Sequence, residues 1–154
     1  MNKRVTIAGV LLGVGLGGFA DGIALHQIAQ WHSMLSNVLP PNTMDAMRVN
    51  MLWDGVFHAF TWAVTVVGLF LLWSAARRPD ALPPTTSFVG SLVLGWGLFN
   101  LVEGLIDHHL LALHNVREVR DPTPYNLTFL LVGGVGLIAL GWLLLRRGGR
   151  SESG

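Results

Sequence analysis

The chain has 154 residues, of which 51% are apolar and only 12% are charged. Soluble domains carry about twice this share of charged residues, so the composition indicates a membrane protein. The absence of cysteine excludes disulfides, zinc-thiolate sites and thiol nucleophiles. A net charge of +1 without a basic run gives no indication of nucleic-acid binding.

Four apolar stretches reach the length of about 20 residues that a membrane-spanning helix needs. They predict helices over about 5–35, 51–76, 86–115 and 125–145. The first stretch follows Lys3 and Arg4 and also resembles a signal peptide that would be cleaved after Ala20. We therefore expect an all-α integral membrane four-helix bundle that forms a single transmembrane domain over residues 1–154.

One pattern occurs twice, with a spacing of 82 residues. An acid followed by glycine, a histidine five residues after the acid and a second histidine six residues later define both copies. Because the second copy lies in mid-chain, the first is better interpreted as a retained helix than as a signal peptide. An internal repeat predicts two tandem helical hairpins, over about 5–78 and 86–147, related by a pseudo-two-fold axis along the membrane normal. The paired residues are Asp21 and Glu103, Gly22 and Gly104, His26 and His108, and His32 and His114.

The basic residues predict the orientation, because cytoplasmic loops are enriched in lysine and arginine. The N-terminus, the turn after the second helix and the C-terminal tail hold seven of them, against three in the other loops. We expect a bacterial inner-membrane protein with both termini in the cytoplasm. The seven are Lys3, Arg4, Arg77, Arg78, Arg146, Arg147 and Arg150, and the three are Arg48, Arg117 and Arg120.

Ionisable side chains gather toward the non-cytoplasmic ends of the first three predicted helices. Such groups are costly in hydrocarbon unless paired, hydrated or bound, so their default interpretation is a functional site. Imidazole and carboxylate suit copper, iron, zinc or manganese. We predict a metal site in the outer leaflet, with redox or metal-handling chemistry. The candidate ligands are Asp21, His26, Asp54, His58, Glu103, Asp107 and His108, with His32 and His114 as an outer shell or entry site.

Several alternatives stay open at this stage. The cluster could be a proton or ion relay, or part of a structural subunit without metal. His26 and His108 could be the axial ligands of a haem, although the nearby carboxylates argue against this. Met44 and Met47 in the outer loop are soft ligands suited to Cu(I) delivery. The sequence does not decide whether the protein is an enzyme, nor whether it forms a homo-oligomer or joins a membrane complex in the lipid bilayer.

Three segments carry a family resemblance: GFADGIALHQIAQWHSML, LWDGVFHAFTW and GWGLFNLVEGLIDHHLLALHNVRE. They resemble the signature stretches of a bacterial family of small four-span membrane proteins, the domain of unknown function 2243 family. The resemblance extends over nearly the whole chain. It implies an integral inner-membrane protein with four helices, and it implies no activity.

Overall fold

The computed structural model describes residues 3–77 and 83–151, and over these residues the chain forms four long helices joined by loops. Each is long and apolar enough to cross a membrane, with mean hydropathy between 1.6 and 2.3. The predicted all-α four-helix membrane bundle is therefore confirmed. The helices are α1 (Lys3–Asp21) continued by the π-helix η1 (Gly22–Ile28), α2 (Met44–Ala76), α3 (Thr85–Leu105) continued by the π-helix η2 (Ile106–Leu110), and α4 (Thr123–Thr128) continued by the π-helix η3 (Phe129–Gly136) and by α5 (Leu137–Ser151).

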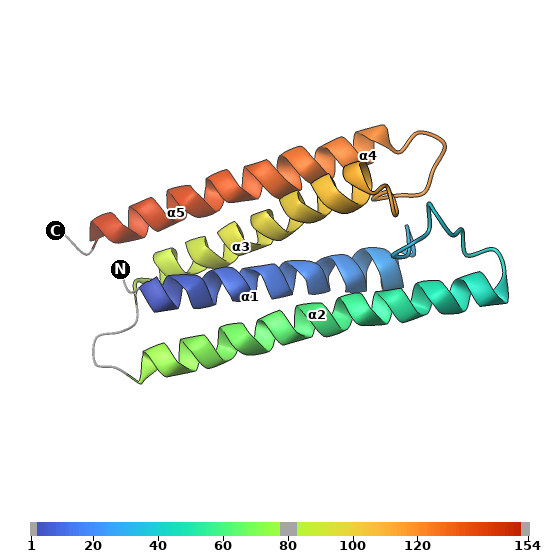
Figure 1. The fold of residues 1–154 in the computed structure, drawn as a ribbon. Coiled ribbons are helices and arrows are strands. Elements are labelled where there is room, and N and C mark those ends of the chain that lie inside the picture. Colours follow the sequence, from blue (N-terminus) through green and yellow to red (C-terminus); the bar gives the residue numbers. More distant parts are fainter. Residues whose placement is uncertain (1–2, 78–82, 152–154) are drawn as a thin grey trace.

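The helices α1 and α3 form the centre of the bundle (Figure 1). The helix α2 packs on α1, while η3 and α5 pack on α3. The two outer helices expose large apolar side chains such as Phe60, Phe70 and Val132 over their length. An apolar exterior of this kind places the bundle in a lipid bilayer.

Glycine lets the backbones of α1 and α3 touch at their crossing. A Cβ atom added to Gly13 would overlap the carbonyl oxygen of Leu92, and one added to Gly95 would overlap that of Val10. Each added Cβ would also lie 3.0 Å from the Cα atom of the other glycine. The two contacts are reciprocal and obey the 82-residue spacing.

Several helix boundaries differ from those predicted. The first helix ends at Ile28 rather than near residue 35, and the third at Leu110 rather than near residue 115. Both end in a π-helix, in which one residue more than usual is accommodated per turn. The second helix begins earlier, at Met44, and the fourth continues to Ser151.

After these two helices the chain reverses through residues in the left-handed conformation. Gln30 has a φ angle of 51° and Ala112 one of 48°. This region disfavours residues with a Cβ atom, by roughly 1–2 kcal/mol. The two residues are again 82 positions apart. The reversal brings His32 and His114 back toward the bundle interior.

Two loops, residues 29–43 and 111–122, are joined to each other, and we call them the outer loops because they lie at the end of the bundle away from Lys3 and Ser151. The backbone amide of Asn37 donates to the backbone carbonyl of Leu113, and the backbone amide of Glu118 donates to the backbone carbonyl of Trp31, both over 3.0 Å. The Glu118 carboxylate accepts from Ser36 Oγ over 2.8 Å and from Asn115. Although partial burial acts to raise it, these hydrogen bonds hold the pKa of Glu118 below its ordinary value. The loops thus form one cap over the end of the bundle opposite to Lys3 and Ser151.

Candidate metal centre

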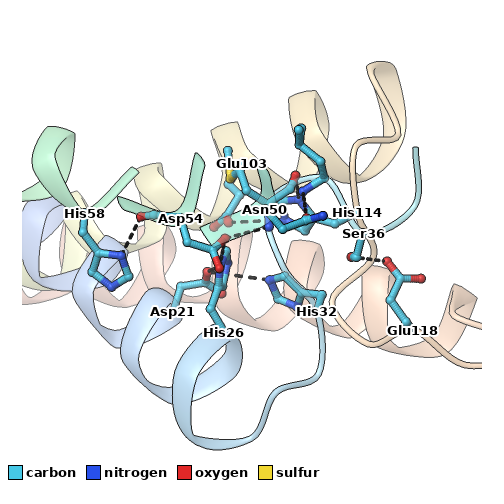
Figure 2. A network of polar contacts seen from close by, with 12 residues as sticks. Asp21, His26, His32, Ser36, Asn50, Asp54, His58, Glu103, His114 and Glu118 are labelled. Atoms are coloured by element: carbon cyan, nitrogen blue, oxygen red, sulfur yellow. Dashed lines mark hydrogen bonds and ion pairs between the residues drawn. The ribbon is translucent and has the colours of Figure 1, made fainter. Parts of the chain in front are cut away.

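Six ionisable residues form one buried cluster beneath the outer loops, between α1 and α3. None is more than 5% exposed. Three come from the first helix and the loop after it, and three from the third helix and its loop, as Figure 2 shows for most of them. The cluster consists of Asp21, His26, His32, Glu103, His108 and His114.

The nitrogen and carboxylate oxygen atoms of the cluster lie close enough to one another to contact the same metal ion. Three sets of three residues each place one nitrogen or carboxylate oxygen per residue within 4.8 Å of the other two. The imidazole rings are also in contact: the ring centroids of His32 and His114 are 4.5 Å apart, and those of His26 and His32 are 4.3 Å apart. The three sets are His26, His32 and His114; Glu103, His108 and His114; and Asp21, His26 and Glu103.

His32 and His114 are oriented by matching backbone contacts. Nδ1 of His32 lies 2.8 Å from the carbonyl oxygen of Val116, and Nδ1 of His114 lies 3.0 Å from that of Met34. A carbonyl oxygen only accepts hydrogen bonds, so in each ring Nδ1 carries the proton. In the neutral imidazole Nε2 is then unprotonated and has a free lone pair. Nε2 of His32 is 3.9 Å from Asp21, and Nε2 of His114 is 3.8 Å from Glu103. Both lone pairs are therefore available within the cluster.

These two imidazoles are neutral at neutral pH. Burial, together with the neighbouring His114 and His26, lowers the pKa of His32 to about 4. Burial likewise lowers the pKa of His114. Because removal from water disfavours the charged form, the cap keeps both rings in the state that binds metals.

His26 is held between two carboxylates. Its Nδ1 donates to Asp54 over 3.0 Å, and its Nε2 lies 3.1 Å from Asp21 Oδ2. Asp54 is fixed in turn by the amide of Met34, which donates to the same carboxylate oxygen over 2.8 Å. The ring of Phe57 stacks on His26, with centroids 5.6 Å apart and planes inclined by 8°. A carboxylate that holds the far nitrogen of an imidazole is typical of metal-ligating histidines.

Most of the buried side-chain polar atoms that lack a hydrogen-bond partner lie in the cluster. Among the described residues, every buried side-chain nitrogen or oxygen without a hydrogen bond belongs to the cluster, with the single exception of Ser87 Oγ. Buried polar atoms are almost always satisfied in native proteins, so a concentration of exceptions needs an explanation. The atoms concerned are both carboxylate oxygens of Asp21 and Glu103, Nε2 of His26, His32 and His114, and both ring nitrogens of His108.

Three of the predicted ligands lie outside these coordination sets. Asp54 contacts the cluster through His26, as described above. Nδ1 of His58 donates to the backbone oxygen of Asp54 over 2.7 Å, and Figure 2 shows its ring beside the cluster rather than within it. Asp107 is half-buried and lines a groove next to Glu103. Met44 and Met47 are exposed on the first turns of α2.

His32 and His114, expected as an outer shell, lie inside the cluster. Helices that continued to residues 35 and 115 would have carried them well above the other candidate ligands, at about 1.5 Å per residue. The early helix ends and the reversals at Gln30 and Ala112 lower them to the level of Asp21 and Glu103. Their positions in the repeated pattern were the available signal that the two belong with the other paired residues, Asp21 with Glu103 and His26 with His108.

The arrangement presents four imidazoles and two carboxylates in a buried space, a donor set suited to transition metals. No curated protein and no solved structure matches the chain. A family described as "Predicted membrane protein (DUF2243)" matches residues 8–148, a range that includes the whole cluster. The chain therefore belongs to the DUF2243 family of predicted membrane proteins.

Proposed function

We propose that this membrane protein binds one or two transition-metal ions in the buried cluster beneath its outer loops. The observation that carries the proposal is the concentration of unpartnered donor atoms there. An unsatisfied buried polar group costs about 1–3 kcal/mol, and more when it is charged. Coordination of a cation would satisfy these atoms together and offset the repulsion between Asp21 and Glu103.

The donor geometry fits a bound ion. Two ligand atoms that each lie about 2.0–2.1 Å from a tetrahedral metal are about 3.3–3.4 Å apart. The 3.1 Å between His26 Nε2 and Asp21 Oδ2 is close to this value, and the two atoms do not have hydrogen-bond geometry. The separations of 3.8–3.9 Å at Glu103 and Asp21 need only a small contraction. Copper, iron and zinc all accept such donors.

The packing of the imidazoles favours a metal ion over haem. The rings of His32 and His114 each lie near those of both His26 and His108, with centroid distances between 4.3 and 6.3 Å. They therefore occupy the space that a porphyrin bound between His26 and His108 would need.

A proton relay across the membrane has less support. Residues 5–20, 59–76, 85–102 and 126–145 contain no aspartate, glutamate, histidine, lysine or arginine. Protons that reached the cluster would find no ionisable side chain in these segments through the other half of the bundle.

The internal repeat is part of the proposal. Five features of the structure recur with the 82-residue spacing: the glycine crossing, the π-helical ends, the left-handed residues, the histidine-to-carbonyl bonds and the histidine-to-carboxylate contacts. They support two hairpins, about 5–78 and 86–147, related by a pseudo-two-fold axis. The second helices of the two hairpins differ in length and do not follow this spacing, and Asp54 of α2 has no counterpart, because residues 123–151 contain no aspartate or glutamate.

The location of the cluster suggests its role. The basic residues favour cytoplasmic termini in a bacterial inner membrane, and the cluster lies at the opposite end of the helices. Arg78 of this count lies outside the described residues. A metal held there would serve redox chemistry or metal delivery at the outer face, and the protein residues would supply neutral imidazoles and two charge-compensating carboxylates.

Elemental analysis of the protein purified in mild detergent, without chelator or a histidine tag, tests the proposal. We expect near-stoichiometric metal in the wild type and its loss in His108→Ala. His109→Ala is the matched control, because His109 is the next residue, is exposed and donates to the carbonyl of Gly104 over 2.6 Å. A wild-type protein that neither contains nor takes up copper, iron or zinc, or equal metal in the two variants, would contradict the site.

A further inference from the structure

The six residues of the cluster fall into two groups, one from each copy of the repeated pattern. Each group consists of one carboxylate and two imidazoles. In the first group, Asp21 Oδ2 lies 3.1 Å from Nε2 of His26 and 3.9 Å from Nε2 of His32. In the second group, Glu103 Oε1 lies 3.8 Å from Nε2 of His114. We call these groups the first half-site, Asp21, His26 and His32, and the second half-site, Glu103, His108 and His114.

The imidazole rings are arranged alike in the two half-sites. The rings of His26 and His32 have centroids 4.3 Å apart and planes inclined by 70°, and those of His108 and His114 have centroids 4.8 Å apart and planes inclined by 76°. Between the half-sites the geometry is different. The rings of His32 and His114 are stacked, with centroids 4.5 Å apart and planes inclined by only 5°. These two parallel rings therefore mark the boundary between the half-sites.

The two parallel rings are badly oriented to bind one ion together. The lone pair of an imidazole nitrogen lies in the ring plane, so a bound metal lies in or near that plane. Stacked rings in contact are about 3.5 Å apart, so an ion shared between them would lie about 1.8 Å out of each plane. That is almost the full length of a metal–nitrogen bond, about 2.0–2.1 Å. The carbonyl contacts of both Nδ1 atoms oppose the rotation that sharing would need. As ligands, His32 and His114 therefore serve different ions.

We propose that the cluster is a two-metal centre with one ion in each half-site. This inference rests on the proposed metal site and gives its number of ions. Asp21, His26 and Glu103 also offer donor atoms within 4.8 Å of one another, so the two half-sites adjoin through their carboxylates. Ions in adjoining sites of this kind lie about 3.5–4 Å apart. Asp54 and Asp107 beside the cluster bring the number of carboxylates to four, which matches the charge of two divalent ions.

The half-sites differ in the support that their first imidazole receives. Nδ1 of His26 donates to Asp54 over 3.0 Å, whereas neither ring nitrogen of the equivalent His108 has a hydrogen-bond partner within the described residues. A carboxylate behind a ligating imidazole makes it a stronger base and typically contributes a factor of about 10–100 to metal affinity. The first half-site should therefore fill first, with an affinity at least about tenfold higher than that of the second.

Titration of the metal-free full chain with Cu(II) in mild detergent counts the ions. Copper that stays bound after desalting is measured by elemental analysis, and competition with a coloured chelator gives the affinities. We expect saturation at two copper ions per chain, in two steps whose affinities differ at least about tenfold. Each Cu(II) ion has one unpaired electron, and two such ions about 3.5–4 Å apart interact magnetically. The electron paramagnetic resonance spectrum should therefore change from that of an isolated ion after the first step to that of a coupled pair after the second.

Matched variants assign each step to a half-site. His108→Ala should keep one copper ion and the tight step, and His26→Ala should keep one copper ion and the weak step, both with the spectrum of an isolated ion. The loss of metal expected above for His108→Ala then amounts to one ion of two. His109→Ala, outside both half-sites, should bind two ions like the wild type. The titration of the wild type does not depend on any variant folding.

The outcomes separate the number of ions from metal binding itself. A wild-type chain that saturates at one copper ion would overturn the two-metal centre and leave the proposed metal site standing. Two bound ions whose spectrum stays that of isolated Cu(II) would also overturn it, because the second ion would then lie away from the first. A chain that takes up no metal would overturn both the two-metal centre and the proposed function.

Discussion

At the scale of single residues, Asp54 shows how a side chain of a ligand type can act through another residue. It lies 3.0 Å from Nδ1 of His26 and belongs to none of the three coordination sets. Asp54 is therefore a positioning residue for His26 in the proposed metal site. Outer partners of this kind typically contribute a factor of about 10–100 to metal affinity.

Asp54→Asn should retain every donor of the cluster and weaken metal binding about tenfold, because a neutral amide makes His26 a weaker base than a carboxylate does. Competition with a coloured chelator in detergent measures the affinity. Asp45→Asn on the same helix is the control, since the Asp45 side chain is 94% exposed. Complete loss of metal in Asp54→Asn would place Asp54 among the ligands, and unchanged affinity would remove it from the site.

The repeated pattern predicted which residues would gather, but not their final levels. Asp21 with Glu103 and His26 with His108 were expected together because they share a helix position in two equivalent copies. The level of His32 and His114 depends instead on Gln30 and Ala112 adopting positive φ angles. Residue type does not signal this conformation at either position, because it is stabilised by contacts made later, such as the Asn37–Leu113 and Glu118–Trp31 bonds.

At the scale of helices, composition predicted the spans well and their ends less well. Apolar length alone identified all four. The early start of α2 had a readable signal, since the Thr43 side chain accepts from the amide of Ala46 over 3.2 Å as an N-cap, but the polar residues after it resembled a loop. The π-helical ends had no comparable signal.

The crossing of α1 and α3 gives a prediction about the bundle itself. Gly13→Ala should destabilise the protein by at least about 2 kcal/mol, because the new methyl group would overlap the backbone of α3, which cannot move as a side chain can. Unfolding of the detergent-solubilised protein with increasing SDS measures this. Gly95→Ala should behave alike, because its clash with α1 is the reciprocal one.

Gly55→Ala is the matched control for the crossing. A Cβ atom at Gly55 would meet nothing within 4 Å, so alanine there should stabilise α2 by about 0.5–1 kcal/mol. Equal stability of Gly13→Ala and Gly55→Ala would mean that the two central helices do not meet as closely as described.

At the scale of the whole molecule, the cap of loops and the cluster lie at one end of the bundle and the described ends of the chain at the other (Figure 1). Which end faces the cytoplasm decides from which side a metal or a soluble partner reaches the cluster. The distribution of lysine and arginine favours the end that holds Lys3, Arg77 and Arg146 as the cytoplasmic one.

The chain contains no cysteine, so single cysteines report its orientation without background. In cells that carry the protein in a bacterial inner membrane, Asn42→Cys in the exposed loop before α2 should react with a membrane-impermeant maleimide once the outer membrane is opened. Gly149→Cys should react only after the inner membrane is disrupted, because it lies at the opposite end, where an added side chain meets nothing within 4 Å. The reverse pattern would turn the cluster toward the cytoplasm and make it a site loaded from the cytosolic metal pool. Labelling of both while the inner membrane is still closed would show that the bundle inserts in two orientations, and then the bias of basic residues is too weak to fix the topology.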